Sequence, residues 1–221
     1  GKVDVVVQSG ENGTRTVLSD GYEYIQEAPV TIQAGAGTDW AHDPITNHAF
    51  VIGQGGSGSS VLKVVDLNVI ETNLTKRSNL NQTRFGMSLP TKTAQSIAIQ
   101  PERDLVFVSS ADELIIIREK VHEGTDWQFE VVSSLSLDSN QGGGIAASGN
   151  VVYVAAGQSG VRVFNSHFPD LAFMMDAIHT RHPARDVCLI ADQVLMVSEV
   201  SQQGIGYIEF FDATTPKHAP V

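Results

Sequence analysis

The chain has 221 residues, and its hydrophobic content of 42% provides for a substantial core and excludes a globally disordered protein. With a net charge of −11 it carries no basic stripe for nucleic-acid phosphates or an anionic membrane surface, and no apolar run is long enough to span a membrane. We therefore expect neither a nucleic-acid partner nor membrane insertion. The single cysteine, Cys188, excludes a disulfide within the chain, and its place in the apolar run 187–190 predicts a small buried core residue.

The first 38 residues predict the last strands of an incomplete sheet. Residues 3–8 and 15–18 flank a Gly-Glu-Asn-Gly turn at 10–13, which is typical of a hairpin. Asp20-Gly21 predicts a second turn, and residues 29–34 predict a further short strand. Because the chain opens within a strand and without Met, and stops at Val221 where a strand is due, we expect a segment of a longer protein.

After residue 38 the same succession of short strands is predicted four times. In the first copy the strands are 40–44, 47–52 and 61–67, and the polar stretch 69–90 is interpreted as an insertion or a long outer connection with a helical turn. The second copy has strands at 96–101, 105–108, 114–117 and 129–137, and the third at 145–147, 151–155, 160–164 and 171–178. The fourth has strands at 185–187, 194–197 and 205–212.

One position of the middle strand marks the repeat. It holds Phe50, Phe107, Tyr153 and Met196, which are 57, 46 and 43 residues apart, and the long first interval contains the irregular stretch 69–90. A period near 43–46 residues, with strands and no intervening helices, indicates an all-β β-propeller of four-stranded antiparallel blades. An immunoglobulin-like sandwich is the alternative, and it predicts no repeated motif.

Two stretches resemble known propeller repeats. IAIQPERDLVFVSS (97–110) and WAHDPITNHAFVIG (40–53) resemble the Ala-x-x-Pro…Val-Tyr-Val pattern of YVTN-type repeats. Residues 186–221, with an Asp-Val start and a Phe-Asp-x-x-x-Pro end, resemble an LVIVD repeat, although no copy carries the full LVIVD string and the third ends in Asn165 instead of Asp. The resemblance covers about 40–68 and 95–221; it implies the fold and leaves the activity open, because such propellers host many functions.

We expect a single propeller domain or propeller segment over 1–221. Residues 1–38 are an incomplete blade, 39–94, 95–140 and 141–184 are full blades, and 185–221 is a second incomplete blade. Because the first unit lacks an inner strand and the last lacks an outer strand, the two do not complement each other in one blade. Either about five imperfect blades close, or the chain is an arc of a larger ring, which we favour; the remaining blades would come from the parent protein or another chain.

No motif of the sequence points to catalysis. Residues 53–58 match G-x-G-x-x-G, but a β-rich run follows where a dinucleotide site needs a helix, so a flexible connection is predicted. Neither the pair His179 and His182 nor the group His42, Asp43 and His48 has a second clustered ligand set, so we predict no metal and no cofactor. The acids at the central channel are interpreted as turn residues, not as a hydrolytic pair: Asp39, Asp112, Asp186 and Glu199.

The predicted site is a loop face. In propellers the connection into each inner strand and the turn between the second and third strands lie on one side. The ligand-binding candidates there are Asp39, Trp40, Gln95, Asp112, Gln158, Arg185 and Gln202, with Trp40 equally interpretable as a core residue. This polar, amide-rich set favours recognition over acid–base chemistry.

We therefore expect a non-enzymatic scaffold or recognition module that binds a protein or glycan. Its expected setting is a larger extracellular or cell-surface protein, with the periplasm as a further setting. The alternative is a propeller enzyme, a lactonase-like hydrolase or quinoprotein-like, with a metal site in the channel. A structural arc that only spaces other domains is a third interpretation.

Overall fold

A computed structural model describes residues 2–8, 15–23, 36–55, 58–68, 83–123 and 126–214, with the backbone alone in 2–8, 15–23, 36–38, 83–85, 121–123 and 126–127. The described elements are β-strands joined by turns and by short helical segments, among them η1 (Pro101–Arg103) and η2 (Pro169–Leu171). Most of these strands belong to four sheets, which we call blades 1 to 4 in chain order. In each blade, strands that follow one another in the chain pair antiparallel.

The strands of the four blades follow the chain order. Blade 1 contains β3 (Ala36–Asp43), β4 (His48–Gln54), β5 (Ser60–Asp66) and β6 (Thr83–Ser88). Blade 2 contains β7 (Ser96–Gln100), β8 (Leu105–Ser109), β9 (Glu113–Glu123) and β10 (Asp126–Ser136). Blade 3 contains β11 (Ile145–Ser148), β12 (Val151–Ala155), β13 (Val161–Asn165) and β14 (Phe173–Ile178), and blade 4 contains β15 (Ala184–Ile190), β16 (Val194–Val200) and β17 (Gly206–Asp212).

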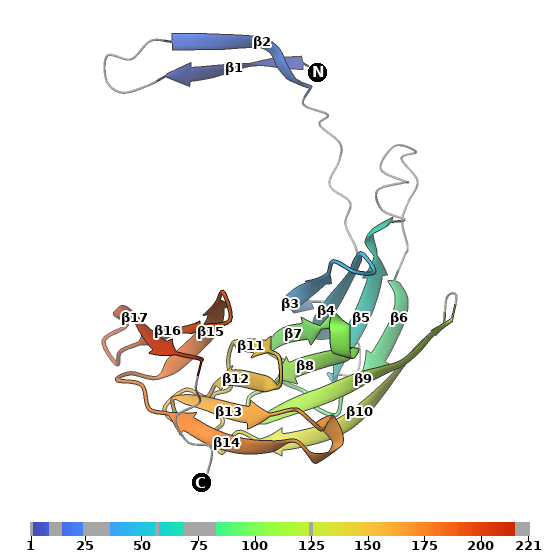
Figure 1. Cartoon of the computed structure of the whole chain (residues 1–221), viewed down its shortest axis with the longest axis vertical. Coiled ribbons are helices and arrows are strands. Elements are labelled where there is room, and N and C mark those ends of the chain that lie inside the picture. The colour runs from blue at the N-terminus through green and yellow to red at the C-terminus, as the bar shows by residue number, and fades with distance from the viewer. Residues whose placement is uncertain are drawn as a thin grey trace.

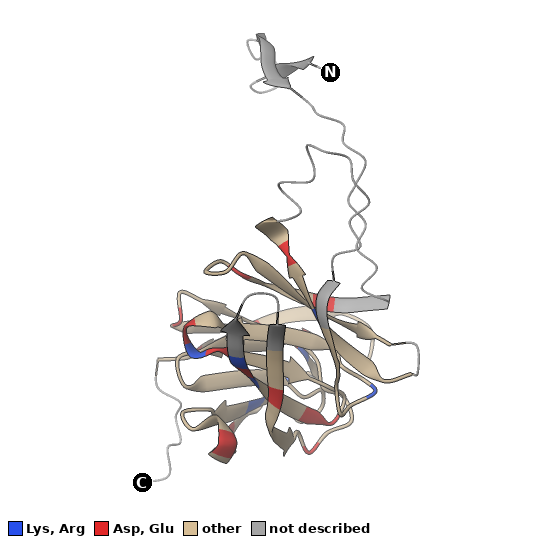
Figure 2. Ribbon diagram, turned by 90° about the vertical axis from the view of Figure 1, so that its right-hand side faces the viewer, with Lys and Arg blue, Asp and Glu red and all other residues tan. Residues whose placement is uncertain are grey.

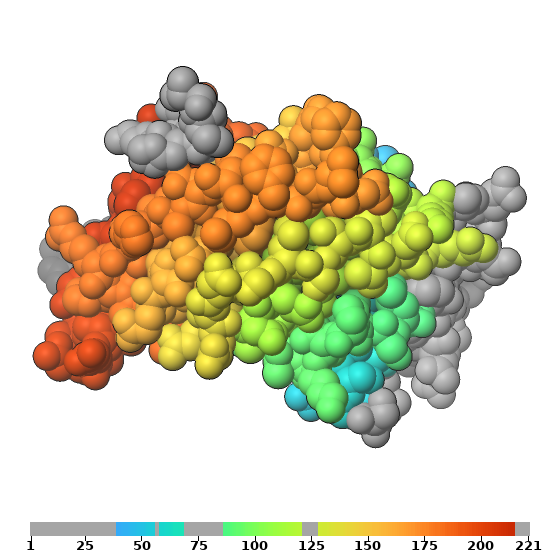
Figure 3. All heavy atoms as spheres, turned by 90° about the horizontal axis from the view of Figure 1, so that it is seen from below, coloured from blue at the N-terminus to red at the C-terminus, as the bar shows by residue number. Residues whose placement is uncertain are grey.

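The blades lie side by side in an arc (Figure 1). The inner strand of each blade contacts the inner strand of the next, β3 with β7, β7 with β11 and β11 with β15. Figure 3 shows the outer strands from below, with β10 between β6 and β14. This arrangement confirms the predicted all-β propeller architecture. The structure shows four blades, three of them four-stranded and one three-stranded, and it does not show the fifth.

The N-terminal hairpin forms a sheet of its own. β1 (Lys2–Gln8) pairs antiparallel with β2 (Arg15–Glu23), as the turn at 10–13 predicted. The second predicted turn, at Asp20-Gly21, is wrong: β2 continues through it, and the register shifts opposite it between Val3 and Val5. An Asp-Gly pair can therefore lie in a bulge instead of ending a strand. The strand predicted at 29–34 lies outside the described residues.

The interpretation of 69–90 as an insertion or a long outer connection is wrong for the C-terminal part of this stretch. Residues 83–88 form β6, the outer strand of blade 1, which pairs with β5. Gly86 interrupts the apolar pattern of this strand, and glycine is depleted in strands, so the sequence alone gave a weak signal. Residues 69–82 lie outside the described part of the chain.

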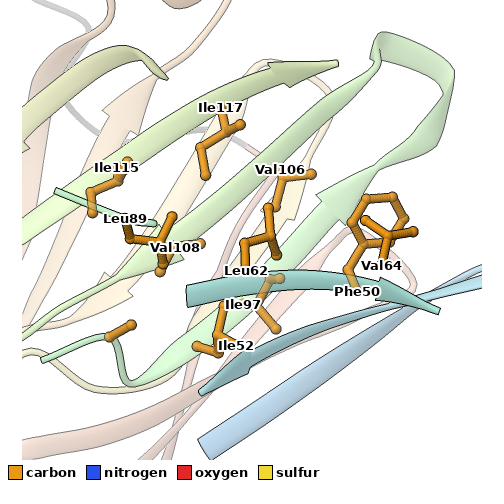
Figure 4. Close-up of a cluster of buried hydrophobic side chains, with 11 residues drawn as sticks. Phe50, Ile52, Leu62, Val64, Leu89, Ile97, Val106, Val108, Ile115 and Ile117 are labelled. Atoms are coloured by element: carbon orange, nitrogen blue, oxygen red, sulfur yellow. The ribbon is translucent and has the colours of Figure 1, made fainter. Parts of the chain in front are cut away.

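The core lies between the blades and forms three clusters. Figure 4 shows the first, in which Phe50, Ile52 and Leu62 of blade 1 meet Val106 and Ile117 of blade 2. The second cluster joins blades 2 and 3, and the third joins blades 3 and 4. Each blade is thus stabilised mainly by apolar burial against its neighbours, as in other repeat proteins.

The residues that marked the repeat occupy one structural position. Phe50, Phe107 and Tyr153 lie opposite Ala41, Ala98 and Ala146 on the inner strands, and Met196 lies opposite Cys188. The predicted repeat is therefore confirmed at the level of strand register. The sandwich alternative is wrong, because the sheets follow one another as blades instead of facing each other as two layers.

Candidate functional site

Backbone hydrogen bonds join the loops on one side of the arc. We call this side the loop face; it comprises the segments 89–95, 137–144 and 179–185, which lead into inner strands, and the turns 110–112, 156–160 and 201–205. Ala111 donates its N–H to Thr93 Oγ1 at 3.3 Å, and its carbonyl oxygen accepts from Gly142 N–H at 2.8 Å. Gly157 and Ala184 exchange two backbone bonds of 3.1 and 2.9 Å. Hydrogen bonds therefore join loops of blades 2, 3 and 4 into one platform.

Three consecutive glycines form the centre of this platform. A Cβ at Gly142 would lie 1.7 Å from the carbonyl oxygen of Ser110, and a Cβ at Gly143 would lie 2.3 Å from that of Arg185. Gly144 donates its N–H to the same Arg185 oxygen at 3.0 Å. Glycine is needed here because the backbone leading into β11 is wedged between blade 2 and blade 4.

The predicted amide residues lie on the loop face. Gln95 precedes β7, Gln158 lies in the turn between β12 and β13, and Gln202 in the turn between β16 and β17, and all three are exposed. Arg185, at the bulge of β15, is also exposed. Asp112 is also exposed, and its Oδ1 accepts a hydrogen bond from the Ser110 hydroxyl at 3.0 Å, so that it shapes its own turn.

Asp39 is positioned differently from the other candidates. Its Oδ2 accepts bonds from the Ser96 hydroxyl at 2.6 Å and from the Ile97 N–H at 3.0 Å, so it links blade 1 to blade 2. Trp40, which could have been core or surface, is 64% exposed in β3. It pairs with Val51 and lies on the side of blade 1 away from blade 2.

The acids considered for an enzyme are engaged in local bonds. Asp186 Oδ1 accepts the Val187 N–H at 2.8 Å. Glu199 is 1% exposed and accepts the His182 N–H at 2.8 Å. Burial, followed by a hydrogen bond with the side chain of Glu209, raises the pKa of Glu199. This carboxyl pair lies within blade 4, and sequence spacing gave no sign of it.

The histidines also make local contacts. His42 Nε2 lies 3.1 Å from Asn47 Oδ1, and His48 Nε2 lies 3.9 Å from Asp66 Oδ2. The His182 ring stacks on Tyr207, with the ring centroids 4.4 Å apart. Within the described ranges, no three side chains of His, Cys, Asp or Glu are close enough to hold a metal ion.

The prediction of a buried Cys188 is wrong. Cys188 is exposed, because its side of β15 faces away from blade 3. An apolar run in a strand predicts burial on both sides, whereas here the side of blade 4 away from blade 3 carries apolar residues and remains uncovered.

A small acidic cavity lies between blades 1 and 2. It has a volume of about 180 Å³, and Asp43, Asp104 and Glu119 contribute to its lining. Burial, with the negative charges of Asp104 and Asp43, raises the pKa of Glu119 to about 7. No local sequence pattern predicts this cavity, because its acids come from three separate strands and turns.

Arginine 103 links blades 2 and 3 at the opposite end of the strands from the loop face. Its guanidinium donates to the Gly149 carbonyl oxygen at 2.6 Å and to the Ser166 carbonyl oxygen at 2.5 Å. Burial lowers its pKa. No local sequence pattern predicts this contact, because it joins residues 46 and 63 positions apart.

Acidic residues outnumber basic residues in the sequence, 25 to 14. In Figure 2 the acidic positions are distributed along the ribbon and the basic positions are few. In the part of the chain that the structure describes, there is no helix with the length and apolarity that a membrane crossing requires.

Comparisons with known proteins identify the fold. No protein-family model and no curated protein matches the chain. Among solved structures, the β-propeller domain of Cps50 (Swd1) from Myceliophteria thermophila has a TM-score of 0.60 at 9% identity, over 97% of this chain and 64% of that one. Sqt1 from Chaetomium thermophilum has a TM-score of 0.59 at 13% identity, over 86% of this chain and 48% of that one.

A functionally unknown protein from Desulfotomaculum acetoxidans gives a similar result, with a TM-score of 0.57 at 12% identity over 80% of this chain and 56% of that one. The chain therefore spans about half to two thirds of the length of these structures. At such identities the similarity establishes the fold alone: the chain is a β-propeller chain of four described blades.

Proposed function

We propose that this chain is a non-enzymatic recognition module that binds a protein or glycan partner through its loop face. The observation that supports this proposal is the hydrogen-bonded platform, from which Gln95, Gln158, Arg185 and Gln202 project as exposed side chains. Because hydrogen bonds hold the platform backbone, the ordering that binding requires falls mainly on these side chains, whose amide and guanidinium groups can bond carbonyl or hydroxyl groups of a partner. The extracellular or cell-surface setting stays a prediction.

A triple variant tests the proposal: Arg185→Ala, Gln158→Ala and Gln202→Ala. The matched control changes three exposed polar residues at the other ends of the strands: Glu102→Ala, Asn150→Ala and Gln193→Ala. Both proteins and the wild type would be applied to a glycan array and to a random peptide display library. We expect ligands of the wild type to bind the control equally and the loop-face variant at least about tenfold more weakly.

Equal binding of every such ligand to both variants would refute the assignment of the loop face. If the wild type bound no peptide and no glycan, the third interpretation, an arc that only spaces other domains, would be favoured instead. Trp40 is left unchanged in this experiment because it lies at an end of the arc, on the side of blade 1 away from blade 2.

A further inference from the structure

The same row of side chains packs against the next blade in blades 1 to 3 and has no described blade against it in blade 4. In each blade the row crosses the inner, second and third strands, and it faces the following blade. The rows are Ala41–Phe50–Val64, Ala98–Phe107–Ile116, Ala146–Tyr153–Val163 and Cys188–Met196–Phe210. Phe50, Phe107 and Tyr153 are at most 4% exposed, because the next blade packs on them.

Blade 4 has no described neighbour on this side. We call the apolar side chains there the blade 4 face: Cys188, Ile190, Met196, Ile208 and Phe210. Phe210 is 62% exposed, Ile208 59% and Ile190 47%. Large apolar side chains gathered on one side of a sheet mark an interaction site in a folded protein.

The first blade exposes the other half of the same interface. In blades 2, 3 and 4, one inner-strand residue packs against the preceding blade. These residues are Ile97, Ile145 and Val187, and each is at most 7% exposed. The equivalent residue of blade 1 is Trp40, which pairs with Val51 as Ile97 pairs with Val108. Trp40 is 64% exposed, and with Val51 it forms what we call the blade 1 face.

A polar link shows the same pattern. Asp39 follows the register shift of β3, and its carboxylate bonds Ser96 and Ile97 of the next blade. Asp186 follows the corresponding register shift of β15 and is exposed, and its Oδ1 accepts the Val187 N–H at 2.8 Å just as Asp39 Oδ1 accepts the Trp40 N–H at 2.8 Å. Blade 1 binds blade 2 through an apolar row and a carboxylate, and blade 4 carries the equivalents of both.

We propose that a second copy of this chain covers the blade 4 face with its blade 1 face. The second copy is the occupant we infer because one chain carries both halves of an interface that it already uses three times, in the same strand register. Such a contact is head-to-tail, and two arcs related by a two-fold axis would form two of these contacts and close into a ring. The contact would cover Trp40 and Phe210 together, as Phe50 is covered within the arc.

The oligomeric state of the full chain tests this proposal. Light scattering after size-exclusion chromatography should give twice the chain mass of 23.7 kDa for the wild type. Phe210→Glu and Trp40→Glu each place a charge in the contact from opposite sides and should weaken self-association at least about thirtyfold. Leu171→Glu, a control at a side chain that is 76% exposed outside both faces, should leave the mass unchanged.

Mixing the two variants separates a head-to-tail contact from a symmetric one. Phe210→Glu retains an intact blade 1 face and Trp40→Glu an intact blade 4 face, so an equimolar mixture should regain one contact and form heterodimers. Ile208→Lys serves as a second blade 4 variant if Phe210→Glu loses its circular dichroism spectrum. A wild type that is monomeric at about 100 µM, where a contact of modest affinity is occupied, would refute the proposal. A dimer insensitive to Trp40→Glu would also refute it, because it would use blade 4 on both sides.

Discussion

The glycine string leading into β11 gives the sharpest stability prediction. An alanine Cβ at Gly142 would lie 1.7 Å from the Ser110 carbonyl oxygen and 2.9 Å from its carbonyl carbon, so backbone must move. Movement of this turn also disturbs two backbone bonds, Gly142 N–H to Ala111 and Leu137 N–H to Asp112, both of 2.8 Å. Overpacking costs about 1–3 kcal/mol and each disturbed bond about 1 kcal/mol, which together amount to about 4 kcal/mol.

Thermal unfolding followed by circular dichroism measures this effect. For a chain of this length, about 4 kcal/mol corresponds to a fall in Tm of roughly 8–16 °C for Gly142→Ala. Gly206→Ala is the matched control, because a Cβ there has no atom within 4 Å; its expected change is within about 0.5 kcal/mol. Gly149→Ala isolates backbone strain, since its φ is +53° and its surroundings are open, and it should cost about 1 kcal/mol.

The reasoning would be refuted if Gly142→Ala unfolded at the same temperature as Gly206→Ala. Such a result would mean that the backbone leading into β11 can accept a Cβ beside the Ser110 carbonyl group without loss of stability. If instead Gly149→Ala and Gly142→Ala lost equal stability, the cause would be backbone strain at a substituted glycine. The tight packing of the segment 142–144 between blades 2 and 4 would then not be the cause.

Three further predictions concern links between blades and one buried acid. Arg103→Ala removes charged bonds to two carbonyl oxygens, one of them that of Ser166, and should cost about 2–3 kcal/mol in denaturant unfolding. Asp39→Ala leaves the Ile97 N–H without its acceptor and should cost about 2 kcal/mol, whereas Asp39→Asn retains an acceptor and should cost less. Because the folded pKa of Glu119 is raised to about 7, the folded state holds its proton longer than the unfolded state, and stability falls as pH rises from about 4.5 to 7. Glu119→Gln should therefore be more stable than the wild type above pH 7 and show a smaller decline over that window, measured by melts across pH.

Each of these predictions has a clear contrary result. An Arg103→Ala protein as stable as the wild type would show that the bonds of the guanidinium to the Gly149 and Ser166 carbonyl oxygens do not stabilise the contact between blades 2 and 3. Equal losses for Asp39→Ala and Asp39→Asn would point to the carboxylate charge instead of the hydrogen bond. A constant difference between Glu119→Gln and the wild type from pH 4 to pH 8 would show that Glu119 does not titrate in this range.

The sequence was sufficient to predict the architecture. Strand alternation and tight-turn residues are local, so the predicted strand 151–155 coincides with β12, and the predicted strands 96–101 and 105–108 end within one residue of β7 and β8, whereas 114–117 covers only part of β9. The period through Phe50, Phe107, Tyr153 and Met196 was also sufficient to identify the equivalent position of each blade. A repeat places equivalent residues in equivalent surroundings, and therefore periodicity predicts register without any knowledge of the tertiary contacts.

Whether an equivalent position has a neighbour was decided by the tertiary structure. Cys188 lies in an apolar run like the buried strands and is nevertheless exposed, because burial in a propeller depends on the next blade. Asp39 and Arg103 bond residues of other blades, Glu119 lies near Asp43 of blade 1 as well as Asp104 of its own blade, and no local pattern specifies these distant neighbours. The sequence by itself therefore determined strands, repeat and loop positions, whereas only packing between blades decided which faces are covered and which carboxylates are linked.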